Sequence, residues 1–353
     1  QPPSTSPFRT SPPLREKVHA MRHWDVLARC LLPLLGTALS LRLSEPAAEP
    51  EPDLSIIHVA YSADAGAFTG LYSSILSLSR SLERPQDCRV HLLVSEQDAA
   101  RAEGLAGCLR RELGEAQALP TLLVHSVSKA MVFDPAKIAG HPHLMRSKAV
   151  FFRLYLPELL PDVERVLYLD TDTIVRADVG PLYRMPMNHA MACSHERAQM
   201  DKFLLAQINT TALEQNMPNK SLPQLQTGVA VFDLRKWRSD GITQAMEEWP
   251  RRLGTYSLQL MLSLEFHNKR GHDVFDEAWN LYGAGLETAF ERWISATPNW
   301  KPEQIAGAKI LHYSGSKKPW SERSRNSKAA MYQDLYTPFV PHQQCEVLRG
   351  PAK

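Results

Sequence analysis

The sequence lacks the features that mark several classes of protein. It has no apolar run of about 20 residues, the length that a membrane-spanning helix needs. Its five cysteines include no C-x-x-C pair, so zinc and thioredoxin-like sites have no support, and their wide spacing leaves the pairing open. Neither sign of charge predominates: 40 Lys and Arg stand against 38 Asp and Glu, and no nucleic-acid partner is predicted.

The N-terminal part reads as a leader followed by a targeting segment. Residues 1–20 are rich in Pro, Ser and Arg without an apolar period, which predicts a disordered or untranslated leader. Residues 21–43 begin with basic side chains and continue into an apolar stretch of about a dozen residues, which favours a signal peptide or short signal-anchor that starts at Met21. An amphipathic leader or organellar presequence is the alternative. Residues 44–54 are rich in Pro and Glu and predict a linker.

Two N-x-[ST] sequons, at Asn209 and Asn219, fit a chain that enters the secretory pathway. With the targeting segment they predict a luminal protein, and the Golgi lumen is the expected compartment. The chain is expected there either anchored through its N-terminal segment or released by cleavage.

Strands alternate with helices from residue 55 onwards. The runs "SIIHVAYS", "RVHLLVS" and "TLLVHSV" are aliphatic and β-branched, and the segments between them have helical spacing of their apolar residues. This alternation predicts an α/β fold with a mostly parallel sheet and helices on both faces. Ligands bind at the carboxyl ends of the strands in such sheets, so residues 60–64 are predicted to line a cleft.

The fourth predicted strand, Arg165–Leu169, ends in Asp170 and Asp172. Its continuous apolar character predicts a central, buried strand, and residues i and i+2 of an extended chain point the same way. Two carboxylates so placed repel each other unless a cation or a proton lies between them. Oxygen ligands favour Mn²⁺ or Mg²⁺, ions that commonly also bridge the phosphates of a nucleotide.

Two enzyme classes end a strand in this way. In one class of phosphatases, with the pattern D-x-D-x-[TV], the first Asp is the nucleophile and the second a general acid. In nucleotide-sugar transferases the carboxylates hold a metal ion on the diphosphate. The phosphatase motif usually follows the first strand of its domain, whereas here at least three strands precede it, and no "GDxxxD"-like loop follows. The transferase is therefore favoured, and the phosphatase is a remote alternative.

The segment "AKILHYSGSKKPW" adds a second group of polar residues near the C-terminal end. A short predicted strand leads into His312, Gly315, Lys318 and Trp320. Imidazole is a good third ligand for Mn²⁺, glycine lets the backbone approach a phosphate closely, and lysine adds positive charge to a diphosphate.

With the strand-borne D-x-D, the H-x-x-G-x-x-K-P-W segment resembles glycosyltransferase family 8, the glycogenin and lipopolysaccharide-galactosyltransferase family. Within it, the chain is most similar to animal glycosyltransferase 8 domain-containing proteins and plant galacturonosyltransferase-like proteins. The resemblance covers residues 56–320. It implies a single catalytic domain of GT-A fold, with a Rossmann-like sheet, over residues 55–322, and a C-terminal helix and tail over 323–353. It also implies retaining transfer of a hexosyl, pentosyl or uronosyl unit from a UDP-sugar to an acceptor hydroxyl, with Mn²⁺ or Mg²⁺ as the cofactor.

The resemblance also assigns roles to single residues. "HVAYSADAG" resembles the family's uracil-binding loop, "KAVFFRLYLPELLP" its arginine-bearing helix, "LQTGVAVFDLRKWR" the segment that lines the donor sugar, and "DEAWN" a segment ending in Trp-Asn. The metal ligands are expected to be Asp170, Asp172 and His312, and the catalytic residues Arg153, Asp172, Gln259 and Lys318. The residues expected to bind the donor and its metal are Ala60, Tyr61, Ser62, Asp64, Lys148, Arg153, Asp170, Thr171, Asp172, Gln226, Thr227, Gly228, Asn280, His312, Gly315 and Lys318.

Two positions depart from the family pattern. Gln226 stands where the family has Asn, and the family's D-Q-D element is missing, with Gln259 as the surviving amide. A binding protein of the same fold without turnover is therefore the second hypothesis. Arg153 also has a purely structural alternative, as a tie between its helix and the sheet.

The resemblance also shapes what we expect of the reaction and its partners. The acceptor is expected to be a glycan, glycoprotein or lipid, contacted by the loop over residues 198–224. Breaking the anomeric bond leaves negative charge on UDP, which the metal, Lys318 and Arg153 are expected to stabilise. Since no carboxylate is clearly available as a nucleophile, the hypothesis is a front-side path in which the departing phosphate accepts the acceptor's proton.

Overall fold

The structure, a computed structural model, describes most of the chain beyond the N-terminal segments. All described residues belong to one compact unit, Glu51–Lys353. They are residues 53–114, 117–128, 148–202, 210–217, 219–253, 257–284, 300–315, 317–320, 332–342 and 345–348. The predicted leader, targeting segment, most of the linker and the sequon at Asn209 lie outside them. Within these ranges, no helix is long and apolar enough to cross a membrane.

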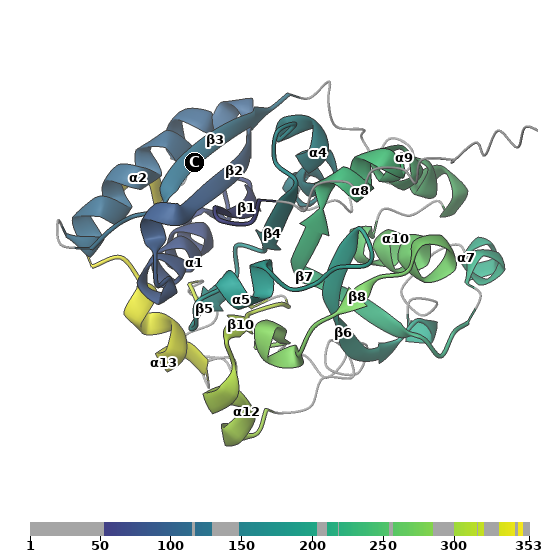
Figure 1. Ribbon diagram of the computed structural model, residues 1–353. Helices are drawn as coiled ribbons and strands as arrows, with labels where there is room; N and C mark the ends of the chain where they lie inside the picture. Colours follow the sequence, from purple (N-terminus) through teal and green to yellow (C-terminus); the bar gives the residue numbers. More distant parts are fainter. Residues whose placement is uncertain are drawn as a thin grey trace, which may run out of the picture. The chain divides into compact units, whose positions relative to one another are not determined.

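A seven-stranded sheet forms the centre of this unit, in the order β3-β2-β1-β4-β7-β6-β8 (Figure 1). The first four strands in this order are parallel, β7 is antiparallel to both of its neighbours, and β8 is parallel to β6. The predicted mostly parallel sheet is therefore confirmed. The strands are β1 (Ile57–Ala63), β2 (Cys88–Ser95), β3 (Thr121–Val127), β4 (Arg165–Leu169), β6 (Met191–Gln199), β7 (Pro223–Asp233) and β8 (Asp273–Val274).

The order of the strands creates a crevice next to β1. The chain moves from β1 through β2 to β3 on one side, and β4 then pairs with β1 on the other side. At such a switch point the loops after the two strands diverge and leave a crevice at their carboxyl ends. The loop after β1 and the loop after β4, which carries Asp170, therefore meet at the same edge.

Helices connect and flank the strands. The α-helices are α1 (Phe68–Ser81), α2 (Ala99–Leu113), α4 (Leu156–Leu159), α5 (Gly180–Tyr183), α7 (Thr210–Asn216), α8 (Leu234–Ser239), α9 (Ile242–Leu253), α10 (Leu258–Glu265), α12 (Pro302–Gly307) and α13 (Gln333–Tyr336). The 3₁₀-helices are η1 (Pro85–Asp87), η2 (Glu96–Asp98), η4 (Ala149–Tyr155), η6 (Glu277–Asn280), η9 (Thr337–Phe339) and η10 (Glu346–Leu348), and η5 (Phe266–Arg270) is a π-helix.

The arginine-bearing segment differs from its prediction as one helix. It forms the 3₁₀-helix η4 followed by the single turn α4. Leu156 donates its N–H to the carbonyl of Arg153, an i→i+3 bond, and Pro157 has no N–H to continue an α-helical ladder. The proline therefore divides the segment, and Arg153 lies in its 3₁₀ part.

A second, three-stranded sheet brings the two distant polar segments together. It consists of β5 (Thr173–Val175), β10 (Ile310–His312) and β9 (Leu281–Tyr282). In the antiparallel pairing of β10 with β5, His312 lies opposite Thr173, and Tyr313 donates its N–H to the Asp172 carbonyl at 2.8 Å. The pairing thus brings His312 beside the carboxylate of Asp172.

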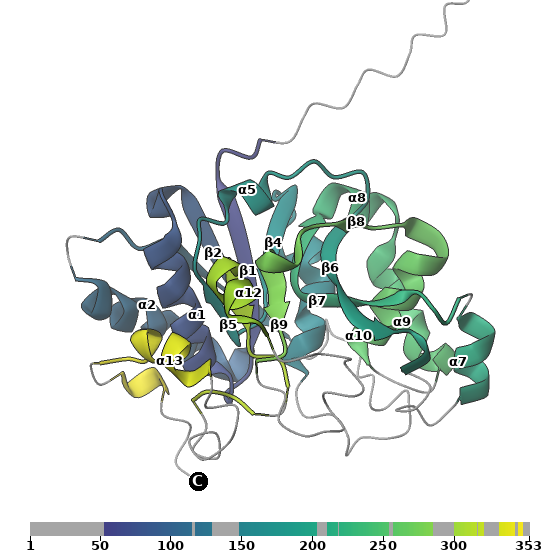
Figure 2. The ribbon, with the colours of Figure 1, turned by 90° about the horizontal axis from the view of Figure 1, so that it is seen from below.

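Serines of α1 satisfy the other edge of β5, which lies beside α1 (Figure 2). The N–H of Val175 donates to Ser77 Oγ at 2.9 Å, and Ser81 Oγ donates to the Val175 carbonyl at 3.0 Å. Ser74 Oγ shares a 2.8 Å hydrogen bond with Thr173 Oγ1. Buried backbone groups need such partners, so these side chains fix β5, and the loop before it, against α1.

One disulfide, Cys108–Cys345, joins α2 to the C-terminal end, with a Cα–Cα distance of 5.6 Å. The sequence left this pairing open, because spacing alone does not say which cysteines approach each other in the fold. Cys88 and Cys193 are free and buried. A disulfide of this kind is typical of proteins that fold in an oxidising compartment.

Candidate functional site

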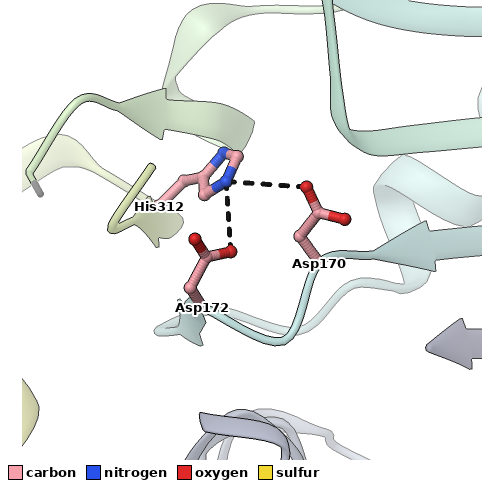
Figure 3. Close-up of side chains that lie close together, drawn as sticks. All are labelled: Asp170, Asp172 and His312. Carbon is pink, nitrogen blue, oxygen red and sulfur yellow. Dashed lines mark ion pairs between the residues drawn. The ribbon is translucent and has the colours of Figure 1, made fainter. Parts of the chain in front are cut away.

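The three predicted metal ligands lie together at the edge of the sheet. One ligand atom each from Asp170, Asp172 and His312 lies within 4.8 Å of the others. His312 Nε2 is 3.3 Å from Asp172 Oδ1 and 3.8 Å from Asp170 Oδ2. Figure 3 shows the imidazole, carried by β10, pointing toward both carboxylates from the opposite side.

Asn280 at the end of η6 determines which imidazole nitrogen faces the carboxylates as an acceptor. Its Nδ2 donates to Ser194 Oγ at 3.0 Å and lies 3.5 Å from the Gln226 carbonyl, which fixes the orientation of the amide. Its Oδ1 then faces His312 Nδ1 at 3.0 Å, so Nδ1 carries a proton. In the neutral imidazole, Nε2 therefore presents its lone pair to the two carboxylates, an arrangement that suits a bound cation.

Gly228 makes the approach of β10 to the sheet possible. A Cβ at this position would lie 2.2 Å from His312 Cε1 and 2.7 Å from Asp170 Oδ2. Its carbonyl accepts a hydrogen bond from the Asp170 N–H at 2.7 Å. The missing side chain thus leaves the space in which the imidazole and the carboxylate meet, and the donor set has both the atoms and the room for a hard divalent ion.

Arg153 compensates the charge of Asp170. It is 5% exposed, and its Nη2 lies 2.6 Å from Asp170 Oδ1 while Nη1 donates to the Thr227 carbonyl at 2.9 Å. The guanidinium also stacks over the Tyr168 ring at 3.9 Å. Burial alone lowers the pKa of Arg153, but the carboxylate of Asp170 raises it, and the net shift is upward. Arg153 therefore both ties η4 to the sheet and brings a permanent positive charge to the site.

Lys318 compensates the charge of Asp172. Its Nζ lies 2.5 Å from Asp172 Oδ2 and donates to the Tyr313 carbonyl at 3.0 Å. Burial alone raises the pKa of Asp172, but the charge of Lys318, the largest of the opposing effects, lowers it well below its ordinary value. The carboxylate is therefore ionised at neutral pH.

Two clefts open on either side of the paired carboxylates. The first, of about 330 Å³, is lined on one side by the end of β1 and the loop that follows it, and on the other by the loop after β10; its lining includes Ser62, Asp64, Thr171, Lys318 and Trp320. The second, of about 360 Å³, is lined by Gln226 and Thr227 of β7 and by Gln259 of α10. His312 at the end of β10 and Gly315 in the loop after it also line this cleft. The residues shared by both clefts are Val150, Arg153, Asp170 and Asp172.

Most of the residues predicted to bind the donor therefore line these clefts, and four do not: Asn280 lies behind His312, and Ala60, Tyr61 and Lys148 lie elsewhere. The side chains of Ala60 and Tyr61 are fully buried in β1, where the hydroxyl of Tyr61 accepts from Ser74. Lys148 directly precedes η4. None of the three is among the residues that line the two clefts. Ser62, near the end of β1, and Asp64, in the loop after it, line the first cleft instead.

A buried acid that sequence reasoning missed, Glu196 on β6, connects the amides of the second cleft. Gln226 Nε2 donates to Glu196 Oε1 at 2.8 Å, Gln226 Oε1 accepts from the Gly228 N–H at 2.9 Å, and Gln259 also hydrogen-bonds the acid. Burial raises the pKa of the Glu196 carboxyl to about 7, against the lowering effect of these two amides. The longer side chain of Gln226 is thus held by a hydrogen bond to Glu196.

Comparison with known proteins decides the family. Residues 123–324 match the model of glycosyl transferase family 8. The chain belongs to this family. Family 8 transferases are retaining enzymes, and the resemblance identified from the sequence is confirmed.

Two relatives show how far this family-8 chain resembles known sequences. It is 26% identical over 305 residues to "Probable galacturonosyltransferase-like 3" of Arabidopsis thaliana, covering 82% of this chain and 81% of that protein. It is 26% identical over 239 residues to human "Glycosyltransferase 8 domain-containing protein 1", covering 59% of this chain and 60% of that protein. The chain therefore spans less than two thirds of the human relative.

A solved structure supports the fold. The galactosyltransferase LgtC, crystallised with donor and acceptor sugar analogues, superposes with a TM-score of 0.55 at 19% identity and covers 83% of this chain and 99% of its own. The family-8 chain therefore has the GT-A fold that its sequence predicted.

Replacing Gly228 with alanine should weaken metal binding strongly. The added methyl group collides with His312 and Asp170, so the ligands cannot converge. We expect the Kd for Mn²⁺, measured by isothermal titration, to rise about a hundredfold, as for the loss of well-placed support around a metal site. Gly307→Ala is the matched control, because a Cβ there meets nothing within 4 Å. Equal Mn²⁺ affinity in both variants would contradict this geometry.

Glu196 should give the stability of the apoprotein a distinct pH dependence. Its pKa rises from 4.5 in the unfolded chain to about 7 in the fold, so between these values the folded chain holds a proton that the unfolded chain has lost. Its contribution is complete below pH 4.5 and is lost as the pH rises through about 7. In urea titrations, the stability of the native chain relative to Glu196→Gln should fall by roughly 3 kcal/mol between pH 4 and pH 8. A pH-independent difference would show that Glu196 is already ionised.

Proposed function

We propose that this family-8 protein transfers a sugar from a UDP-sugar to an acceptor hydroxyl with the help of a divalent metal ion. The observation that carries the proposal is the convergence of two carboxylates and an acceptor imidazole nitrogen between two clefts, with a cation on each side. A diphosphate needs such a site, because its charge has to be neutralised before it can leave.

Asp170, Asp172 and His312 are proposed to hold the metal, which is Mn²⁺ or Mg²⁺. Two carboxylates suit either ion, and the imidazole favours the softer Mn²⁺. When bound, the ion supplies Lewis-acid charge to the oxygens of the diphosphate. Asn280 holds the imidazole of His312 in the tautomer that a ligand needs.

The residues of the first cleft are proposed to bind the nucleoside and its phosphates. Ser62 and Asp64 offer hydrogen-bonding groups at the switch point of the sheet, and Trp320 offers an apolar ring nearby. Lys318 and Arg153 lie against the carboxylates that flank the cleft, so both are close enough to share their charge with a leaving UDP. As the sugar–phosphate bond breaks, this positive charge stabilises the developing negative charge.

The second cleft is proposed to bind the donor sugar. Gln226, Thr227 and Gln259 offer amides and a hydroxyl that suit sugar hydroxyls. Among the described residues that line this cleft, the carboxylates are Asp170 and Asp172, and Glu196 lies behind the amides. This supports the front-side path, in which the acceptor oxygen attacks the anomeric carbon while the departing phosphate oxygen takes its proton.

The identity of the sugar and the location of the protein are part of the proposal. The similarity to plant proteins named galacturonosyltransferase-like favours a uronosyl, hexosyl or pentosyl donor, and the acceptor is a glycan, glycoprotein or lipid. The disulfide and the exposed sequon at Asn219 support the secretory pathway, with the Golgi lumen as the proposed site. We further propose residues 55–322 as the catalytic domain and residues 21–43 as the signal or anchor.

A second function deserves a test because the donor-sugar cleft departs from the family pattern. With Gln226 in place of Asn and the D-Q-D element missing, the protein could bind a UDP-sugar and metal without turnover. The aspartyl phosphatase is not carried further, because the chain belongs to family 8.

The decisive measurement is UDP release from a panel of UDP-sugars with Mn²⁺ and water or simple glycosides as acceptors. We expect release from one sugar of the panel, and Asp172→Ala should lower it at least a thousandfold, because the variant removes a metal ligand. A matched control is Asp240→Ala, which removes a carboxylate that pairs with Arg270 and is not among the residues that line either cleft.

The outcomes separate the two functions. Sugar-selective release that disappears in Asp172→Ala identifies a transferase and its donor. Metal-dependent binding of UDP without release from any sugar identifies the binding protein. Absence of UDP binding contradicts both.

A further inference from the structure

The C-terminal end of the chain lies outside the matched family region, and its contacts lead back to the clefts. The described residues 332–342 and 345–348, called the strap below, contain α13, η9 and η10. They lie beside α1 and α2 in both views (yellow in Figures 1 and 2). The sequence offered no chemistry for this segment.

At one end the strap supports the loop that carries Lys318. Gln333 Nε2 donates to the Pro319 carbonyl at 2.6 Å, and Tyr313 donates its hydroxyl to the Tyr332 carbonyl at 2.8 Å. These contacts lie on both sides of Lys318 along the chain. The position of the lysine therefore depends on strap residues as well as on its own ion pair with Asp172.

Tyr336 is the centre of this contact. It is 1% exposed, and its ring lies 5.8 Å from the Trp320 ring and 5.8 Å from the Tyr313 ring. Its hydroxyl shares a 2.7 Å hydrogen bond with Ser73 Oγ of α1. Trp320 also packs on Gly70, where a Cβ would lie 2.5 Å from its ring. The end of the loop is thus held between α1 and the strap.

At its other end the strap is anchored to α2 and reaches the loop after β1. Cys345 is joined to Cys108, and His342 Nδ1 lies 2.6 Å from Glu112 Oε1. Arg101 hydrogen-bonds the Val347 carbonyl and, through Nη1, the Ala65 carbonyl at 2.7 Å. Ala65 lies between residues that line the first cleft, so one arginine connects the strap to the second wall of that cleft.

We infer that the disulfide-anchored strap positions both walls of the nucleotide cleft, with Gln333 and Tyr336 acting as positioning residues for Lys318 and Trp320. This inference rests on the proposed function for its ligand, a uridine diphosphate with its metal. A cleft whose walls are fixed in advance loses less conformational entropy on binding, so releasing the strap weakens nucleotide affinity. The metal ligands are untouched, so the affinity for metal alone is unchanged.

The test uses the full chain and its Cys108→Ser/Cys345→Ser variant, at a temperature where circular dichroism shows both to be folded. Hydrogen exchange of the backbone amides of residues 314–320, measured without nucleotide, should accelerate in the variant by about tenfold or more. The Kd for UDP in the presence of Mn²⁺, measured by titration, should rise about tenfold, while the Kd for Mn²⁺ alone stays the same.

Two further variants separate positioning from general loss of stability. Gln333→Ala removes the contact with Pro319 and leaves the disulfide intact, and it should raise the Kd for UDP in the same direction. Trp249→Phe is the destabilising control. It removes the buried hydrogen bond from Trp249 of α9 to Glu265 of α10, and these helices lie across the molecule from the strap in Figure 1. It should lower the melting temperature and leave the Kd for UDP unchanged.

The results distinguish failure of the inference from failure of the proposed function. Unchanged exchange in residues 314–320 of the serine variant overturns the inference, whatever the nucleotide result. Native chain that binds no UDP overturns the proposed function and, with it, the ligand named here. If the native chain and both strap variants bind UDP with the same Kd, the inference is overturned and the proposed function is not.

Discussion

Repulsion between Asp170 and Asp172 is the constraint around which the site is organised. Two ionised groups at the mouth of a sheet need countercharge, and every neighbouring element supplies some of it or supports a residue that does. The countercharge comes from Arg153 of η4 and from Lys318 of the loop after β10, while β10 itself brings the imidazole of His312 against both carboxylates. Each of these residues is brought in by a different tertiary contact, so the elements are held together partly by the charge that they share.

The polar groups behind this site restrict its geometry. Asn280 fixes the imidazole, Gln226 bonds both its own strand and Glu196, and the serines of α1 complete the backbone bonds of β5. Buried polar groups cost free energy when they lack partners, so each such bond restricts the arrangement to one geometry. Such a site is preorganised, because its polar groups are already in place before a ligand binds. Stabilisation of a transition state by fixed charges requires this preorganisation.

The sequence predicted the parts of the fold and site that local patterns encode. Apolar runs marked β1 to β4, and the strand-borne pair of carboxylates together with the segment at His312 marked the candidate metal ligands. It did not predict the contacts that need the third dimension. Glu196 lies in a strand of mixed polarity, where the alternation of side chains does not show that the acid is buried. A glycine is required at position 228 because His312 of β10 packs against it, and this contact is not visible in the sequence. Pro157 alone could have indicated that the Arg153 segment is not one helix. The exit of β1 was predicted to begin at Ala60, whereas the strand continues to Ala63, since boundaries of strands are not encoded as strongly as their existence.

The small sheet β5-β10-β9 also constrains the order in which the protein becomes functional during synthesis. Its middle strand is β10, which leaves the ribosome long after β5 and the carboxylates that precede it. Domains fold as their chains emerge, and pairings between distant segments form late. Throughout this interval Asp170 and Asp172 have neither His312 nor Lys318 beside them, and β5 has only α1 as its partner. The nascent protein therefore carries an acidic, incomplete site, and the candidate metal site is complete only when the last third of the chain has joined the rest.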